Sequence, residues 1–441
     1  MALSKQRSQD IINALRRGTV PKSSLDAIAT GLDSFRDTLD QELGAVKAGN
    51  ASFKAVRGEY GCGKTFFSRW FSERAKELGF ATSEVQISET ETPLYSLEKV
   101  YRRICERIGT SDCAEGAFRN ILDSWFFTLE NDILREKGMP LTDESALIAA
   151  TNDLMEKRLS NLGDKSQTFS IALRAYRKAQ LENDLPTADA ISAWLAGQPN
   201  IAAQAKRYAG IKGDIDHFAA LTFLQGMLTI LNDSGYSGLL VVLDEVETVQ
   251  RMRSDIRDKS LNALRQLMDE VDGGRFPGLY LLITGTPTFF DGPLGVKRLE
   301  PLAQRLHVDF QTDPRFDNPR AVQMRLPPFD LERLILIGIR IRDIYAGQSV
   351  NAERIRKLCD DGFIKNFADA VAGKLGGKVG LAPRIFLKKL VADLLDRIDQ
   401  FDDFDPRTHY ALKLDPSELS QLEKEAAGIQ SADDVVLDLN E

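Results

Sequence analysis

Residues 58–65 read GEYGCGKT, which matches the phosphate-binding pattern G-x-x-x-x-G-K-[ST] at every fixed position. The three glycines allow the backbone to bend until several N–H groups point into one concavity, and the dipole of a following helix adds to the attraction for phosphate. Lys64 is placed to reach the β- and γ-phosphates of a nucleotide, and the Thr65 hydroxyl to ligate Mg²⁺. A glycine-rich turn that matches by chance is the alternative. The motif predicts a P-loop.

Two adjacent carboxylates follow the apolar run LLVVL at residues 239–243. Asp244 and Glu245 therefore stand at the carboxyl end of a predicted buried strand, which is the Walker B pattern. Asp244 is suited to the Mg²⁺ shell and Glu245 to orienting or deprotonating the attacking water, because a dry strand end fixes both carboxylates beside the γ-phosphate. Many strands of α/β proteins end in acids at a solvated edge. Asp244 and Glu245 therefore indicate a Walker B motif only because a P-loop precedes them in the chain.

Further polar residues follow later predicted strands. The apolar run at residues 279–283 ends at Thr284, where the additional-strand class of P-loop ATPases has sensor 1, a polar residue that contacts the γ-phosphate or the water. Thr286 is close behind, and an ordinary turn is the alternative for both. Arg305, or else Arg298, stands where oligomeric ATPases of this class carry an arginine finger that completes a neighbour's site. A solvated helix face is the alternative for each arginine.

Arg384 follows Pro383 at a predicted helix start, since proline favours the first turn of a helix. It resembles sensor 2, which contacts the γ-phosphate from a lid, and a solvated helix start is the alternative. Four lysines accompany it: Lys374, Lys378, Lys388 and Lys389. This basic stretch could also face outward and meet the phosphates of DNA.

The sequence pattern around these residues predicts an α/β fold with a parallel sheet that positions them. Apolar or alternating runs predict strands at residues 53–56, 81–87, 239–243, 279–283 and 322–326. Most other segments have helical spacing. The expected parts are an N-terminal helical segment at residues 1–50, a P-loop core at 51–328 with a helical insertion at about 110–237, a helical lid domain at 329–405, and a C-terminal helix with an acidic tail at 406–441.

The composition sets outer limits. With 43% hydrophobic and 28% charged residues, the 441-residue chain has the composition of a soluble globular protein. No apolar run approaches the ~20 residues of a membrane span, and the first residues lack a secretory signal, so we expect a cytoplasmic protein with no membrane partner. Four cysteines without C-x-x-C pairing and three scattered histidines disfavour disulfide and zinc frameworks. The net charge of −8 excludes a surface that is wholly a nucleic-acid footprint and leaves a local basic patch open.

Four motifs together resemble the ATP-binding proteins of BREX phage-defence systems, and most closely the smaller, BrxD-like type. They are GTVP at residues 18–21, GEYGCGKTF at 58–66, LDEVE at 243–247 and PR at 383–384. The resemblance implies an AAA+ core related to origin-recognition and STAND ATPases, and a role in bacterial defence against phage DNA beside methyltransferase or helicase partners. ATP and Mg²⁺ are the expected cofactors on the strength of the P-loop and Walker B residues, and we expect a homo-oligomer that works on or near double-stranded DNA.

The candidate site residues fall into three sets. The expected cofactor-binding residues are Val20, Gly58, Glu59, Tyr60, Gly61, Cys62, Gly63, Lys64, Thr65 and Phe66. The expected catalytic residues are Asp244, Glu245, Thr284, Arg305 and Arg384. The expected metal ligands are Thr65 and Asp244.

Two classes of function remain open at this point. The first is an ATPase that switches or assembles on ATP and remodels or licenses a nucleoprotein complex. The second is a nucleotide-dependent scaffold that binds ATP and seldom hydrolyses it. Glu245 favours hydrolysis. A kinase or GTPase is a distant third, because the chain has no N-K-x-D guanine-reading motif.

Overall fold

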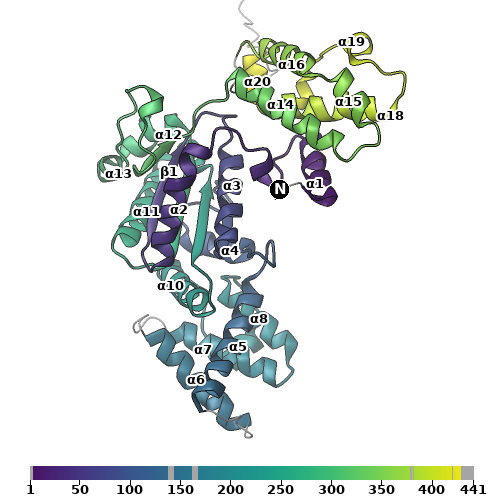
Figure 1. The fold of residues 1–441 in the computed structure, drawn as a ribbon. Helices are drawn as coiled ribbons and strands as arrows, with labels where there is room; N and C mark the ends of the chain where they lie inside the picture. The colour runs from purple at the N-terminus through teal and green to yellow at the C-terminus, as the bar shows by residue number, and fades with distance from the viewer. Residues whose placement is uncertain are drawn as a thin grey trace, which may run out of the picture.

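The computed structural model describes residues 3–137, 144–160, 167–377, 380, 382–419 and 421–428. Lys378 and the predicted acidic tail at 432–441 lie outside these ranges. Three parts follow one another along the molecule in Figure 1: a helical arm at the bottom, an α/β core in the middle and a helical lid at the top right.

The core contains one parallel sheet of five strands. They are β1 (Ser52–Arg57), β2 (Ala81–Gln86), β3 (Leu239–Asp244), β4 (Leu279–Gly285) and β5 (Gln323–Arg325). The strand order is β2-β3-β4-β1-β5, and every pair is parallel. The α/β fold and the five predicted strands are confirmed. All carboxyl ends therefore meet at one edge, and β4 lies between the strand that enters the P-loop and the strand that ends in Asp244.

Both faces of the sheet are covered, as a parallel sheet requires. Leu239, Val241 and Leu243 of β3 belong to a hydrophobic cluster with α4 (Leu97–Arg107), α10 (His217–Asp233) and α11 (Ser254–Asp272). The alternate residues Leu240 and Val242 belong to a second cluster with α2 (Asp33–Lys47) and α3 (Lys64–Glu77). This second cluster continues into the lid, so the core and the lid share apolar packing.

Most of the described residues between positions 110 and 237 lie in helices, and the described residues of this range contain no strand. The helices before α10 are α5 (Phe118–Lys137), α6 (Glu144–Leu159), α7 (Gln167–Leu181), α8 (Leu185–Leu195) and α9 (Ala203–Ala209). Trp125 and Tyr176 are fully buried between them. Helices α5 to α8 form the arm that projects away from the lid in Figure 1.

The lid is built from helices that follow β5. They are α14 (Leu331–Ala346), α15 (Ala352–Leu358), α16 (Asp361–Lys374), α17 (Ala382–Lys389), a π-helical stretch (Leu390–Leu395), α18 (Asp396–Gln400), α19 (Pro406–His409) and α20 (Gln421–Ala426). Between β4 and β5 lie two short helices, α12 (Pro287–Asp291) and α13 (Glu300–Arg305).

The N-terminal helix α1 (Lys5–Arg16) packs on the lid, against α14 and α17, while α2 packs on the sheet (Figure 1). Ile11 and Ile12 are fully buried there. The Arg16 guanidinium donates to both carboxylate oxygens of Asp396 at 2.6 and 2.8 Å. The predicted N-terminal segment is therefore divided between the two bodies, and residues 17–32 connect them.

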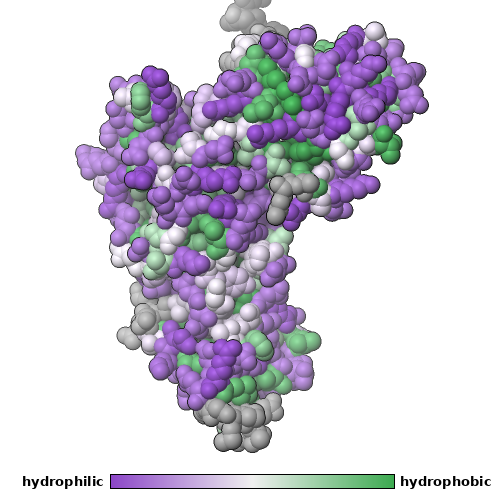
Figure 2. Space-filling model, viewed as in Figure 1, coloured by the Kyte–Doolittle hydropathy of each residue, from purple (hydrophilic) through white to green (hydrophobic). Residues whose placement is uncertain are grey.

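The face shown in Figure 2 is mostly hydrophilic, with separate hydrophobic areas over the lid, the core and the arm. In the described part of the chain, no helix is both long and apolar enough to cross a membrane.

Candidate functional site

The predicted P-loop connects β1 to α3. Gly63 precedes α3 with φ of 95°, a left-handed value that favours glycine. A Cβ on Gly58 would lie 2.3 Å from Cys62 Sγ, so a side chain at position 58 would force Cys62 to move. No side chain of the described residues caps the first turn of α3. Its first N–H groups therefore stay available for an anion.

Lys64 already lies inside the loop. Its Nζ donates to the carbonyl oxygens of Gly58 at 3.0 Å and Glu59 at 3.4 Å, and lies 4.9 Å from the centre of the Tyr60 ring. The same atom is 3.7 Å from Glu247 Oε1. The ammonium group is thus buried and held by carbonyl dipoles.

Three of the predicted residues meet at the carboxyl edge of the sheet, where two hydroxyl groups contact one carboxylate. Thr65 Oγ1 donates to Asp244 Oδ2 at 3.1 Å, and Thr284 Oγ1 donates to Asp244 Oδ1. Asp244 is only 4% exposed. Hydroxyl and carboxylate oxygens are hard ligands of the kind that Mg²⁺ takes, usually together with several waters and the phosphates of a substrate. The pair Thr65 and Asp244 therefore fits a magnesium ion chemically.

Glu245 has a left-handed backbone, with φ of 59°. This conformation is uncommon outside glycine and clusters at functional sites. Its N–H donates to Thr284 Oγ1 at 3.2 Å, and its carboxylate accepts from Gln86 Nε2 at 2.9 Å. Gln86 is the last residue of β2 and pairs in register with Asp244, which places its side chain beside Glu245. The sequence alone did not reveal this strand register, so it did not indicate Gln86.

A cavity of about 340 Å³ lies beside these groups. Three regions line it: the P-loop with Asp244, Glu245 and Glu247; the segment around the GTVP motif; and the lid with the turn before it, including Phe329, Arg333, Ile337, Pro383 and Arg384. Its volume is within the range of small-molecule sites, roughly 300–1,000 Å³. Val20 lines this cavity, and its carbonyl accepts from Arg69 Nη1 of α3 at 2.9 Å. This hydrogen bond holds the GTVP motif against α3, the helix that follows the P-loop.

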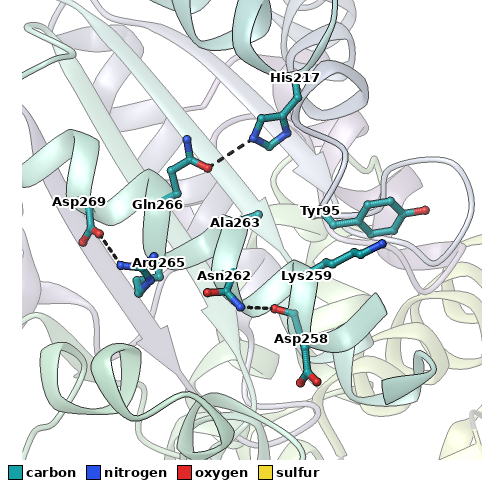
Figure 3. A pocket seen from close by; sticks show the side chains of 9 residues that line it. All are labelled: Tyr95, His217, Asp258, Lys259, Asn262, Ala263, Arg265, Gln266 and Asp269. Carbon is teal, nitrogen blue, oxygen red and sulfur yellow. Dashed lines mark hydrogen bonds and ion pairs between the residues drawn. The ribbon is translucent and has the colours of Figure 1, made fainter. Parts of the chain in front are cut away.

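A second cavity, of about 450 Å³, lies on the outer side of α11 (Figure 3). It is lined by Tyr95, His217 and seven residues of α11 that include Lys259 and Gln266, with His217 Nε2 3.4 Å from Gln266 Oε1. The lining contains no glycine and neither Asp244 nor Glu245. Although this cavity is larger, it lacks a phosphate cradle, and the candidate site is the cavity at the P-loop.

The two arginine-finger candidates lie beside the second cavity. Arg305 forms an ion pair with Asp269, and Arg298 with Asp258, and both acids line that cavity. Neither arginine is among the described residues that line the cavity at the P-loop. Thr286, the alternative to Thr284, is buried and caps α12. A finger that serves a neighbour's site remains a prediction for Arg305.

Arg384 lines the P-loop cavity, but its guanidinium binds the C-terminal segment. Nε donates to Glu423 Oε1 at 3.1 Å, and Nη2 donates to Glu423 Oε2 and, at 2.7 Å, to the Glu418 carbonyl. Lys388 and Lys389 form ion pairs with the Glu418 carboxylate at 2.9 and 2.6 Å. Much of the predicted basic stretch is therefore paired with acids from residues 418–423. Glu418 and Glu423 lie roughly 30 to 40 residues after these basic residues in the sequence, so no local pattern indicated the pairing.

Cys62 is 6% exposed, and burial raises the pKa of its thiol. Since the thiolate is the reactive form, we expect iodoacetamide at neutral pH to alkylate Cys62 much more slowly than the partly exposed Cys113. Peptide mapping by mass spectrometry over time would measure both rates. Equal rates would contradict the buried placement. Where modification of Cys62 succeeds, it should block ATP, because Sγ lies against the backbone of Gly58.

A family model described as BREX system ATP-binding protein BrxC/D matches residues 3–414. The match includes the P-loop, Asp244, Glu245 and Arg384, and ends before Glu418 and Glu423. A search of curated proteins gave no match.

Proposed function

Because the chain belongs to the family of BREX system ATP-binding proteins BrxC/D, we propose that it is a Mg²⁺-dependent ATPase that acts as a switch or remodelling factor in a BREX phage-defence complex. The observation that carries this proposal is the meeting of Thr65, Thr284 and Asp244 beside the P-loop. Phosphate-binding, metal-binding and water-positioning groups thereby share one cavity.

Each residue has a distinct part in the proposed reaction. The P-loop N–H groups and Lys64 hold the phosphates, and Thr65 with Asp244 would hold Mg²⁺, which neutralises charge on the phosphate oxygens when bound. Thr284 orients Asp244 and the backbone of Glu245. Glu245, positioned by Gln86, orients the attacking water or takes its proton.

The strand order supports an AAA+ core. β4 separates β1 from β3, as expected for the additional-strand class of P-loop ATPases, and a helical lid follows the last strand. The apolar part of the cavity, where Val20 and Ile28 face the lid residues Ile337 and Leu387, is suited to the adenine base. A nucleotide there would contact core and lid together and so favour one lid position over another.

Calorimetric titration of the full chain with ATP and ADP, with and without Mg²⁺, combined with a phosphate-release assay, tests the proposal. We expect binding that requires Mg²⁺ for full strength, and turnover above background. An absence of ATP binding would overturn the proposal. Binding without turnover would instead support a nucleotide-dependent scaffold, the second candidate, which the pairing of Arg384 with Glu423 in this structure favours.

We further propose that the protein assembles as a homo-oligomer and works with DNA-modifying or DNA-unwinding partners of its defence system, such as a methyltransferase or a helicase. Light scattering after size separation, with and without ATP and with and without duplex DNA, tests both assembly and DNA binding. A mass that stays monomeric under all four conditions would contradict the proposed oligomer.

Arg384→Ala is expected to lower ATP turnover by about tenfold, because a guanidinium that contacts the γ-phosphate from the lid stabilises both closure and the reacting charge. Lys388→Ala is the matched control: Lys388 lies on the same helix and pairs with Glu418, but it is not among the described residues that line the cavity. Equal turnover in the parent and Arg384→Ala would show that Arg384 only fastens the C-terminal segment.

A further inference from the structure

Glu247 is a buried acid of the candidate site for which the proposed reaction has no use. It lies on the 3₁₀ helix Val246–Arg251 directly after Glu245, and lines the P-loop cavity. Its side chain is 5% exposed. Among the described residues, neither of its carboxylate oxygens has a hydrogen-bond partner. Within the described part of the chain, its ion-pair partner is Lys64, whose Nζ lies 3.7 Å from Glu247 Oε1.

Such an arrangement is costly, because a buried carboxylate normally accepts several hydrogen bonds. Burial raises the pKa of Glu247, Lys64 acts against that rise, and the neighbouring carboxylates Glu245 and Asp244 add to it. Burial raises the pKa of the Tyr60 phenol on the P-loop, and the charge of Glu247 adds to this rise. Arg251, at the end of the same 3₁₀ helix as Glu247, acts against it. Lys64 is therefore the main source of favourable charge for Glu247.

We propose that Glu247 is the counter-ion of Lys64 while the site is empty, and that it sets nucleotide affinity by competing with the phosphates for the Lys64 ammonium group. This inference rests on the proposed nucleotide site. In this structure Glu247 supplies the negative charge beside Lys64 and two carbonyls supply the dipoles, and phosphate oxygens would compete with both. Glu247 is thus a positioning residue that acts through Lys64.

Glu247→Gln tests this role, because the amide keeps the shape of the side chain but removes the charge. We expect the dissociation constants of both ATP and ADP to fall by about tenfold, within the usual range of coupling between two sites. The gain should disappear in the Lys64→Ala background, since a double-mutant cycle isolates the interaction between the two residues. Calorimetry with nucleotide up to millimolar concentration would measure all four proteins.

Other results would overturn the inference. Unchanged affinity in Glu247→Gln would show that no competition occurs, and an equal gain in the Lys64→Ala background would show that Glu247 repels phosphate directly. Loss of turnover at unchanged affinity would make Glu247 the base. Failure of the parent protein to bind ATP would instead count against the proposed function. Glu247→Asp, whose shorter side chain moves the charge away from Lys64, should bind nucleotide with intermediate affinity and serves if the glutamine variant does not fold.

The chain offers a closely matched control on β1, the strand that leads into the P-loop. Lys54 of β1 is also buried, donates to two carbonyl oxygens, those of Pro319 and Ala321, and pairs with Glu42 at 2.6 Å. Glu42→Gln removes a carboxylate from a comparable lysine outside the candidate site. We expect this variant to lower the melting temperature without changing nucleotide affinity. A gain in affinity equal to that of Glu247→Gln would mean that the effect is not specific to the P-loop.

Discussion

Lys64→Ala is expected to weaken ATP binding by about 10- to 150-fold, because hydrogen bonds to charged groups contribute about 1.5–3 kcal/mol and a tenfold change in affinity corresponds to about 1.4 kcal/mol. Lys64 is the one lysine that the P-loop contributes, and its Nζ is already buried within the cavity. Calorimetric titration with Mg²⁺ and ATP measures the loss. Hydrolysis should fall with it at substrate concentrations that saturate the parent protein.

Lys259→Ala is the control for the location of the site, because Lys259 lines the second cavity. It should bind ATP like the parent. The Lys64 variant also loses the contacts to Gly58 and Glu59, so its thermal unfolding must be compared with that of the parent. ATP binding that survives in Lys64→Ala and fails in Lys259→Ala would move the nucleotide to the outer side of α11.

Glu245→Gln should retain ATP binding and lower turnover on the order of 100-fold or more, the usual contribution of a positioned general base. The amide keeps the size of the side chain and can still accept from Gln86, but it cannot take a proton from water. Phosphate release at saturating ATP measures the turnover, and calorimetry measures the affinity.

Glu84→Gln is a matched control for this change. Burial raises the pKa of Glu84, a carboxylate of β2, and the charge of Asp244 adds to this rise, but Glu84 is not among the described residues that line the cavity. The turnover of this variant should stay within a few-fold of the parent. If Glu245→Gln turned over ATP at the parental rate while Glu247→Gln lost activity, the base would be Glu247, the buried carboxylate two residues later.

The core elements could be predicted because their signals are local. A continuous apolar run in β3 followed by two acids, and a glycine pattern before a helical stretch, each determine a strand end or a loop without reference to distant residues. Once the strands are parallel, their carboxyl ends meet, so Asp244 and Thr284 had to lie near the P-loop.

The remaining features depend on contacts between distant segments. Gln86 reaches Glu245 through the register of β2 with β3, and Arg384 is held by an acid 39 residues later in the chain. Glu247 could have been noticed, since the third acid of LDEVE lies beyond a strand end, but its burial depends on how the 3₁₀ helix packs under Lys64. The pairing of Arg305 with Asp269 likewise joins two helices separated by β4.

The docking of α1 on the lid bears on how the protein can be shortened for experiments. A polypeptide that starts at Gly18 retains the whole P-loop and every acid of the cavity, yet it lacks Ile11 and Ile12, which are fully buried, and Leu15, which is 5% exposed. Their removal would uncover an apolar strip on α14 and α17, and Asp396 would lose its guanidinium partner. Exposed strips of this kind promote aggregation. Poor yield or lost activity of such a truncated protein would therefore report on the solubility of the lid rather than on the chemistry of the phosphate loop.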